Sequence, residues 1–195
     1  MTDPREILYS LPTLCDPGPA TDATPLPAGH CWLEEDAWRQ VEFVARTNLA
    51  HIRHQLAALT TFKKKHRRDP GWTDVYMRKE HPAPFAAVGL RFTSLPRFST
   101  SGLAIGDGPP WGGAVLGGFA LSNGGDWFFY GQRTDDDRVI QLAVSPGHSA
   151  ASGQFALAVS QLAQTGGLLL VDWYTGTVVD TSSVESVLAW TRRCQ

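Results

Sequence analysis

Two groups of acidic side chains have the chemistry to form a metal, catalytic or binding site. Asp135, Asp136 and Asp137 are consecutive and fall between two strand-like runs, which predicts the tip of a hairpin. A calcium loop needs oxygen ligands at alternating positions and usually a later glutamate, so the triplet predicts an exposed acidic turn rather than a metal site. Asp172 follows four apolar residues and precedes Trp173, so we expect its carboxylate to be partly buried. A buried carboxylate needs hydrogen-bond donors, and Asp172 therefore either holds a turn, which we favour, or marks a functional site.

Histidines and serines give weaker signals. His51 and His54 are three residues apart on a predicted helix and share one face, but no carboxylate accompanies them in the spacing of a helical zinc site. His148 lies among serines in the segment SPGHSAAS, which begins at Ser145. Catalytic triads are assembled in space from distant positions, so a loop leading into a helix is the better interpretation of this segment. We predict neither a metal nor a cofactor.

The glycine-rich segment from residue 106 to residue 118, GDGPPWGGAVLGG, matches neither a P-loop nor a dinucleotide-binding motif. Its two prolines also lack the backbone N–H groups that would cradle a phosphate. We therefore predict a long loop, with Trp111 at its tip either exposed as a contact residue or folded back on the core. A pocket near this loop, served by His148 or Asp172, is what the alternative of an enzyme or small-ligand-binding protein would need.

Charge is unevenly distributed along the chain, although its net value is only −2. Five cationic side chains lie between Lys63 and Arg68, directly after an apolar helical stripe. Nucleic-acid-binding domains are usually basic throughout or interleave cations with aromatic residues, and this chain does neither. Because cations are also stabilised at the C-terminal end of a helix, the run predicts a helix end and no nucleic-acid partner. From residue 99 onward the chain has fewer basic than acidic side chains, which favours a basic protein partner.

Composition indicates one folded domain. The 195 residues, 43% of them hydrophobic, suffice for a sizeable core. The three cysteines have no short spacing, which argues against a disulfide framework or a zinc site. No run approaches the roughly 18 apolar residues of a membrane span, and the N-terminal segment lacks the apolar run of a signal peptide. We expect a cytoplasmic protein without a membrane partner.

The pattern of predicted helices and strands along the chain indicates an α+β fold. Residues 1–31 contain six prolines and predict an extended arm or a disordered tail, while residues 32–195 form a single domain. Runs of strand-forming residues, broken by glycine and proline, predict a mainly antiparallel or mixed sheet of about five to seven strands. One of these runs covers residues 85–95. Two or three helices cover the sheet.

The helices and one hairpin can be placed more closely. Residues 34–47 are either the start of a long helix or a strand, and a helix then follows from Asn48 with an apolar stripe. A second helix is predicted over residues 152–164, and a third after Ser182 and Glu185, which have the spacing of a capping box. Residues 168–179 predict a hairpin that turns at residues 174–176 and whose first strand lies inside the sheet.

Aromatic and acidic residues expected at the surface outnumber the catalytic candidates. Such a surface is typical of a protein that binds another protein. The predicted contact residues are Trp111, Trp127, Tyr130, Asp135, Asp136, Asp137 and Tyr174.

Two segments carry a resemblance to a known family. They are the glycine-punctuated run LGGFALSNGGDWFFYG and the tryptophan-bearing hairpin GLLLVDWYTG. With these segments, the size and layout of residues 32–195 resemble bacterial immunity proteins, the small cytoplasmic α+β antidotes to toxins delivered by type VI secretion or contact-dependent systems. The resemblance implies a non-catalytic protein that blocks the active site of a cognate toxin. A structural or adaptor subunit, with the proline-rich arm as a peptide ligand, is a further alternative.

Overall fold

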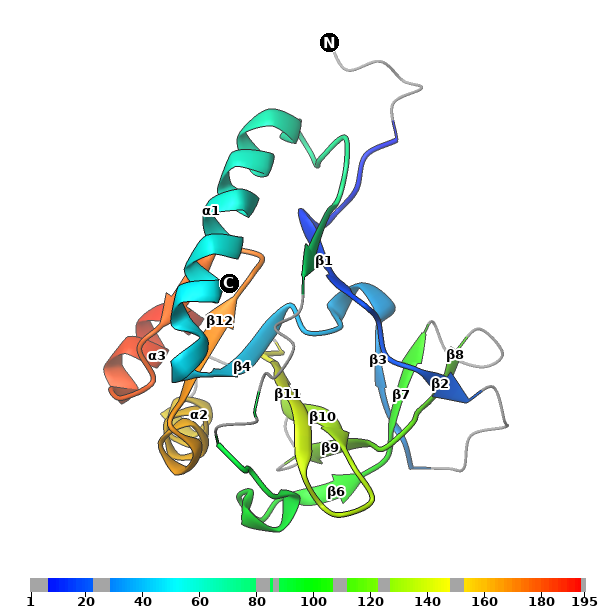
Figure 1. Cartoon of the computed structure of the whole chain (residues 1–195), viewed down its shortest axis with the longest axis vertical. Coiled ribbons are helices and arrows are strands. Elements are labelled where there is room, and N and C mark those ends of the chain that lie inside the picture. The colour runs from blue at the N-terminus through cyan, green and yellow to red at the C-terminus, as the bar shows by residue number, and fades with distance from the viewer. Residues whose placement is uncertain are drawn as a thin grey trace.

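The structure is a computed structural model that describes residues 7–22, 29–79, 85, 88–106, 112–122, 127–147 and 153–193. Within these ranges the chain is α+β, as the sequence predicts, and its three α-helices gather on one side of the molecule (Figure 1). The α-helices are α1 (Leu49–His66), α2 (Gly153–Gly166) and α3 (Val184–Thr191), and the short 3-10 helices are η1 (Glu35–Ala37), η2 (Arg46–Asn48) and η3 (Phe92–Ser94).

A seven-stranded sheet, antiparallel at every described pairing, forms the centre of the molecule. Across the sheet the strands are β13 (Thr177–Val179), β12 (Leu168–Asp172), β4 (Val41–Ala45), β11 (Val139–Ser145), β10 (Phe128–Arg133), β9 (Gly118–Ser122) and β6 (Ser99–Ser101). β4 and β12 pair along their full length, whereas β4 and β11 pair only through Glu42 and Ala143. The sheet is therefore weakly joined at this point.

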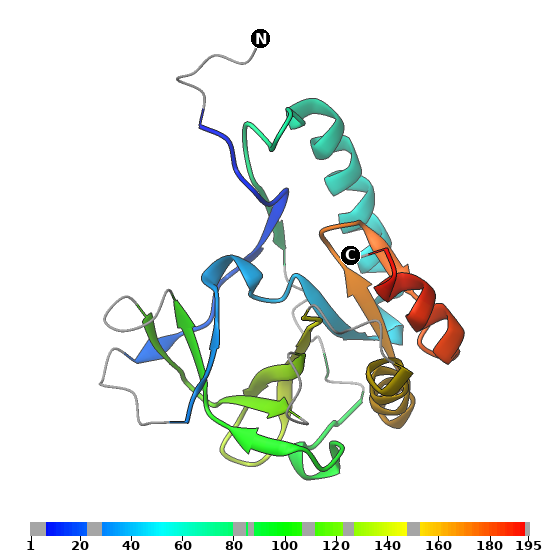
Figure 2. The same ribbon diagram turned by 180° about the vertical axis from the view of Figure 1, so that it is seen from behind.

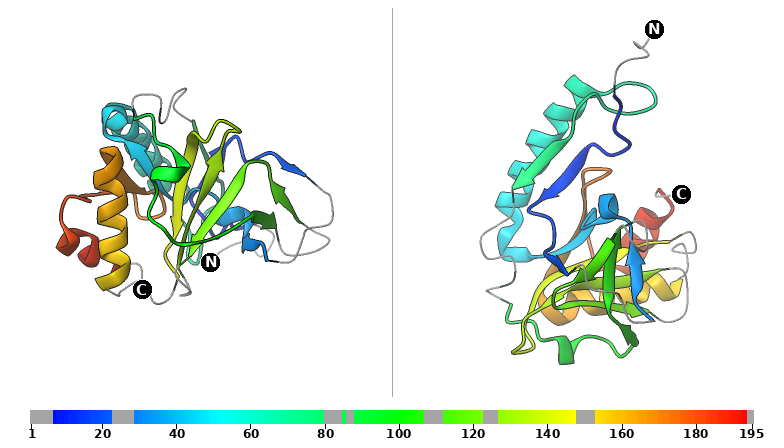
Figure 3. Two further views of the ribbon diagram at one scale, coloured as in Figure 1. Left: turned by 90° about the horizontal axis from the view of Figure 1, so that it is seen from below. Right: turned by 90° about the vertical axis from the view of Figure 1, so that its right-hand side faces the viewer.

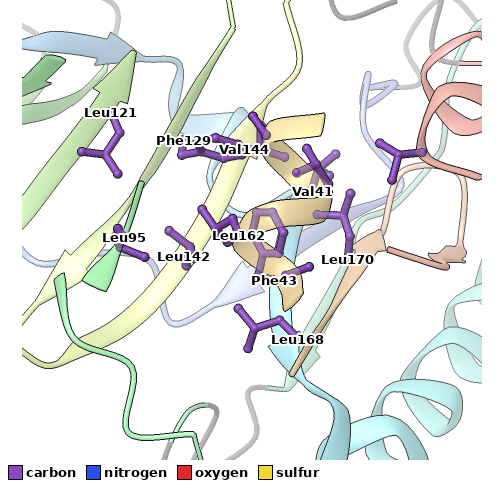
Figure 4. Packing of buried hydrophobic residues seen from close by; sticks show 14 of the residues in the cluster. Val41, Phe43, Leu95, Leu121, Phe129, Leu142, Val144, Leu162, Leu168 and Leu170 are labelled. Carbon is purple, nitrogen blue, oxygen red and sulfur yellow. The ribbon is translucent and has the colours of Figure 1, made fainter. Parts of the chain in front are cut away.

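Both faces of the sheet are buried at β4 and β12, because alternate side chains point to opposite sides of a strand. Phe43 and Leu170 belong to the core cluster that includes α2 and α3, and Figure 4 shows Leu162 of α2 packed over them. Val44 and Val171, one residue further along each strand, pack instead with α1. These two strands read as nearly continuous apolar runs for this reason.

A smaller four-stranded sheet lies on the side of the molecule away from the helices (Figure 3). Its strands, in order, are β2 (Thr21–Asp22), β8 (Gly112–Val115), β7 (Leu103–Gly106) and β3 (Cys31–Leu33). Leu33, Leu103 and Ile105 from this sheet form a core cluster with Tyr130 and Ala143 of the main sheet. The sequence-based count of five to seven strands fits the main sheet alone and misses this second layer.

The described part of the proline-rich arm is extended, as predicted, but it is built into the fold. β1 (Thr13–Asp16) pairs in parallel with β5 (Tyr76–Lys79), and Figure 2 shows the two strands side by side near α1. β2, also from the arm, pairs with β8. The described residues of the arm therefore do not form a disordered tail.

Residues 34–48 follow the strand alternative rather than the long helix. β4 ends at Ala45, η2 follows, and α1 begins after Asn48 at its N-cap. Ile52 and Leu59 of the predicted apolar stripe are 4% and 1% exposed and pack on β4 and β12. Lys63, Lys64 and Lys65 lie in the last turn of α1, so the basic run is the end of a helix, as predicted.

Three local predictions are wrong. In the segment predicted as a strand over residues 85–95, the described residues form η3 and an isolated bridge at Arg91. Gly112 and Gly113 lie in β8 rather than in a loop. Gly112 permits close packing there, since an added Cβ would stand 2.3 Å from the Ile105 carbonyl oxygen on β7. Ser183, not Ser182, caps α3 by accepting a hydrogen bond from the Ser186 N–H.

Candidate functional site

A groove of about 400 Å³ lies where the ends of β4, β11 and β12 meet. Val41 and Val144 line it, next to the single residue pair that joins β4 to β11. The 3-10 helix η1 and the turn after β12 form its sides, and Arg193 beyond α3 reaches it. Its volume lies within the range of about 300–1,000 Å³ that is usual for ligand pockets. Residues of the glycine-rich segment 106–118 do not appear among its described lining residues, so the pocket expected there is not this groove.

Asp172 stands at the edge of the groove and holds the turn of the β12–β13 hairpin. It is 1% exposed, and its Oδ1 accepts a hydrogen bond of 2.9 Å from the Thr175 N–H. Its Oδ2 accepts a hydrogen bond of 2.8 Å from Trp190 Nε1 on α3. The predicted burial is confirmed, and the contacts are those of the structural role that the sequence favours.

Two acids of the η1 region, Glu34 and Asp36, line the groove on the side opposite the hairpin. Both are exposed, and neither carboxylate has a hydrogen bond or ion pair with another described residue. Tyr174, at the tip of the hairpin, also lines the groove and is 47% exposed. The groove therefore combines carboxylates and an aromatic ring that are accessible from outside.

Gln40, just before β4, is the buried polar residue of the groove. It is 8% exposed, and its Nε2 donates a hydrogen bond of 2.8 Å to the Thr13 carbonyl oxygen of β1. That bond fixes the amide plane, and Gln40 Oε1 has no hydrogen-bond partner among the described residues. A buried acceptor without a partner is unusual, since most such groups are satisfied in folded proteins.

A second polar cluster lies on the other side of β4 and is closed. Arg39 Nε donates to Glu42 Oε2 at 2.5 Å, and both side chains are almost fully buried. Trp173 Nε1 donates to the other carboxylate oxygen of Glu42 at 2.8 Å. Arg78 of β5 stacks on the Trp173 ring, with its guanidinium carbon 4.7 Å from the ring centroid. The carboxylate of Glu42 thus has partners for both of its oxygens inside the protein.

Arg78 and Tyr130 complete this closed cluster. Burial lowers the pKa of Arg78, and the nearby Glu42 carboxylate opposes that shift. Tyr130 accepts a hydrogen bond from the Arg39 N–H at 2.8 Å and donates one to the Ala37 carbonyl oxygen at 2.9 Å. Burial also raises the pKa of Tyr130 well above its ordinary range. Tyr130 is 1% exposed, so the prediction that it is a surface contact is wrong.

Trp127 is likewise a core residue and not a surface contact. It is 3% exposed and makes an edge-to-face contact with Phe155 of α2, with ring centroids 5.1 Å apart. Both sides of the main sheet are covered here, with Trp127 in one core cluster and Tyr130 in another, and the sequence does not distinguish such aromatic residues from exposed ones. Trp111 lies outside the described residues, as do His148 and the serines that follow it.

The acidic triplet sits at the tip of the β10–β11 hairpin, as predicted, but two of its members have partners within the protein. Asp137 accepts hydrogen bonds from the N–H and Oγ1 of Thr93, and these bonds lower its pKa. Asp136 accepts from Thr134 and forms an ion pair of 2.9 Å with Arg138, and its pKa is lowered as well. The triplet is therefore partly neutralised and is a weaker acidic surface than the sequence indicates.

The basic end of α1 contacts the turn of the β12–β13 hairpin. Lys63 donates a hydrogen bond to the Tyr174 carbonyl oxygen and is half-buried. Burial lowers the pKa of Lys63, while the negative charge of Asp172 opposes the shift. Arg67 stacks on Trp72, with its guanidinium carbon 4.4 Å from the ring centroid. Arg68 Nη1 donates to the Arg67 carbonyl oxygen at 2.8 Å. Three of the five cations therefore have contacts within the protein, which supports a role in the fold.

Histidine and cysteine side chains form no metal site in the described parts of the chain, where no group of three or more potential ligands is found. His51 Nε2 lies 3.2 Å from the Lys79 carbonyl oxygen, and His54 is exposed. Cys15 and Cys31 form no disulfide with a described residue. In the described residues, no helix is long and apolar enough to cross a membrane.

Sequence reasoning missed Glu34, Asp36 and Gln40 as site residues. Their segment, LEEDAWRQ, predicts secondary structure but no site on its own. The one signal in the sequence is the acids in front of a strand, and in the structure that strand pairs with β12 at Asp172.

Comparison with known proteins leaves the site to be judged on its geometry. The chain matches no protein-family model, and no curated protein or solved structure is significantly similar to it.

Proposed function

We propose that this chain is a non-catalytic, cytoplasmic protein that binds another protein, and specifically an immunity protein that blocks the active site of a cognate secreted toxin. The observation that carries the proposal is the pair of exposed carboxylates, Glu34 and Asp36, beside the exposed ring of Tyr174 at an open groove. Accessible acids steer a basic partner, and an exposed aromatic residue supplies an anchor.

The distribution of satisfied acids supports this assignment. Glu42 and Asp172 are buried, and donors inside the protein bind both oxygens of each carboxylate. Glu34 and Asp36 have no such donors among the described residues. A toxin that acts on an anionic substrate carries basic residues at its active site, and these would supply the missing donors.

Co-expression with the secreted effector encoded next to this gene tests the proposal. We expect the protein to restore growth of cells that carry the active effector, and the two proteins to elute as one complex in size-exclusion chromatography. The double variant Glu34→Gln/Asp36→Asn should weaken the complex, because it removes charge without changing side-chain size. An effector that stays toxic and does not form a complex would contradict the proposal.

Small-ligand binding is the second candidate function, and the volume of the groove favours it. Catalysis has less support, because the lining serines Ser10 and Ser145 have no hydrogen bond to a carboxylate of the groove and no described histidine or lysine lines it to activate them, and both oxygens of Asp172 are occupied. An adaptor role for the proline-rich arm also has less support, because Thr13–Asp16 already pair with β5. A metabolite screen by thermal shift, in which a neutral molecule raised Tm of the wild type and not of a Val41→Trp variant, would favour the small-ligand alternative.

A further inference from the structure

Cys15 and Arg78 lie side by side at the closed polar cluster. They are Cα partners in the parallel pairing of β1 with β5, so their side chains leave the two strands on the same face. Cys15 is 8% exposed and Arg78 is 3% exposed. Both line one small cavity, of about 20 Å³, together with Arg39 and Glu42. A thiol and two guanidinium groups are therefore enclosed in one place.

Arg78 is a buried cation without a carboxylate of its own. Glu42 is the one carboxylate among the described residues that line the cavity, and its two oxygens already accept from Arg39 and Trp173. Arg78 donates through Nη2 to the Arg39 carbonyl oxygen, and its Nη1 has no hydrogen-bond partner in the described chain. Because a guanidinium group stays charged in a protein and a buried charge needs an opposite one, the cluster requires a second anion.

Cys15 is the group that can supply this anion. Tyr130 is the other weak acid of the cluster, but burial raises its pKa well above its ordinary range, so the phenol stays protonated. His51 and Lys79 also line the cavity, and any charge they carry is positive. A thiol beside guanidinium groups ionises more readily, and the charge of Cys15 in turn opposes the lowering of the Arg78 pKa by burial.

We propose that Cys15 is held as a thiolate by the guanidinium of Arg78 and is a site of oxidation by hydrogen peroxide. In this step the thiolate sulfur attacks one peroxide oxygen, so that an S–O bond forms while the O–O bond breaks. Sulfur is oxidised, the peroxide is reduced, and the second oxygen leaves as hydroxide. The product is a sulfenic acid, which a thiol can reduce again.

The size of the cavity limits the oxidant. A volume of about 20 Å³ admits a molecule of about the size of water, and hydrogen peroxide is the oxidant nearest to that size. Lys79 is exposed and His51 is partly exposed, so the cavity that they line lies just beneath the surface. The bulky disulfide reagent DTNB should therefore not react with Cys15 in the folded protein.

The test treats the full-length protein with hydrogen peroxide at pH 8 and at pH 6. The remaining thiols are alkylated after denaturation and assigned by tandem mass spectrometry. We expect the oxidation rate of Cys15 to change by less than about threefold between the two pH values, because a thiolate has no proton to lose. Cys31 is the internal control. It is half-buried and burial raises its pKa, so its rate should fall about a hundredfold.

Variants of Arg78 separate its charge from its packing. Arg78→Lys keeps a positive charge, and the rate at Cys15 should again change by less than about threefold with pH. Arg78→Met keeps an apolar stem against the Trp173 ring but removes the charge, so the rate at pH 6 should fall at least about tenfold. A direct measurement of ionisation that needs no Arg78 variant is the thiolate ultraviolet absorbance of the wild type minus that of Cys15→Ser, titrated with pH.

Two results would overturn the thiolate: a rate at Cys15 that falls with pH as the rate at Cys31 does, or no oxidation of Cys15 at either pH. Equal rates in the wild type and a folded Arg78→Met variant would show that Arg78 is not the counter-ion. Partner binding at the groove does not enter these measurements, so this inference and the proposed function stand or fail separately.

Discussion

The two sides of β4 use carboxylates in opposite ways. On one side Glu42 is buried against α1 and β5, and Arg39 and Trp173 bind both of its oxygens. On the other side the groove exposes Glu34 and Asp36, for which the described chain offers no donor. Acids whose oxygens have donors inside the protein stabilise the fold, whereas acids without such donors are available to bind another molecule. The number of acids in a region does not make this distinction, as the partly neutralised hairpin tip at Asp136 and Asp137 shows.

The largest loss of stability is expected for Glu42→Gln, in the closed polar cluster. The variant leaves the buried guanidinium of Arg39 without its carboxylate. It also places an amide NH2 group, which cannot accept a hydrogen bond, against either Arg39 Nε or Trp173 Nε1. Losing one partner of a buried ion pair costs about 3–5 kcal/mol, and we expect a loss of this size in the free energy of unfolding from urea titrations. Glu34→Gln, the same change at the groove, should stay within about 0.5 kcal/mol. Equal effects of the two variants would show that the two sides do not differ.

A smaller loss in the free energy of unfolding is expected from Asp172→Asn. This variant tests the acid that belongs to both the β12–β13 hairpin and the groove. Both oxygens of Asp172 accept hydrogen bonds, from Thr175 and Trp190, and asparagine has only one oxygen to offer. One buried donor loses its acceptor, which costs about 1–3 kcal/mol in the free energy of unfolding. If the variant is as stable as the wild type but binds no partner, Asp172 belongs functionally to the groove.

The smallest effect is expected at the β10–β11 hairpin tip, and it depends on pH. The bonds from Thr93 lower the pKa of Asp137 below its value of about 3.9 in an unfolded chain. The unfolded state therefore binds more protons, so this contribution to stability is present above about pH 3.9 and is lost as the pH falls through the lower pKa of the folded state.

Asp137→Asn should therefore reduce the fall in Tm between pH 7 and pH 3. Asp137 has φ of 71°, a left-handed conformation that asparagine also tolerates, so the change isolates the charge. Asp135→Asn is the control, because Asp135 is exposed at the same tip. If both variants respond to acid in the same way, the bonds from Thr93 do not stabilise the fold.

The sequence predicts the elements of this fold better than their partners. Local patterns suffice for α1, α2 and the two hairpins, because each depends on periodicity and turn residues within one segment. The second sheet is missed because β3 pairs with β7 across about seventy residues, and no local signal encodes that pairing. The strand predicted over residues 85–95 fails for the converse reason, since its apolar side chains pack on the core while its described backbone pairs only through the single bridge between Arg91 and Arg138.

The candidate site is harder to predict, because it is defined by which polar groups remain unsatisfied. Trp127 and Tyr130 look like contact residues in the sequence, but each is buried in a different core cluster, because both sides of the main sheet are covered at this point. Glu34 and Asp36 look like ordinary acids at the start of an element and become site residues only when the hairpin at Asp172 lies opposite them. Tyr174 is the one predicted contact residue that the structure describes both as exposed and as part of the groove.

The pairing of early with late segments has a consequence for how the protein is made. β1 emerges from the ribosome about sixty residues before its partner β5, and β4 waits about 130 residues for β12. Until residues 168–172 have been synthesised, β4 lacks the neighbour with which it pairs along its full length and exposes apolar side chains on both faces. Such long-range pairing makes folding slow and leaves the nascent chain prone to aggregation. The groove, which needs the turn after β12, can form only after residues 172–175 have been synthesised.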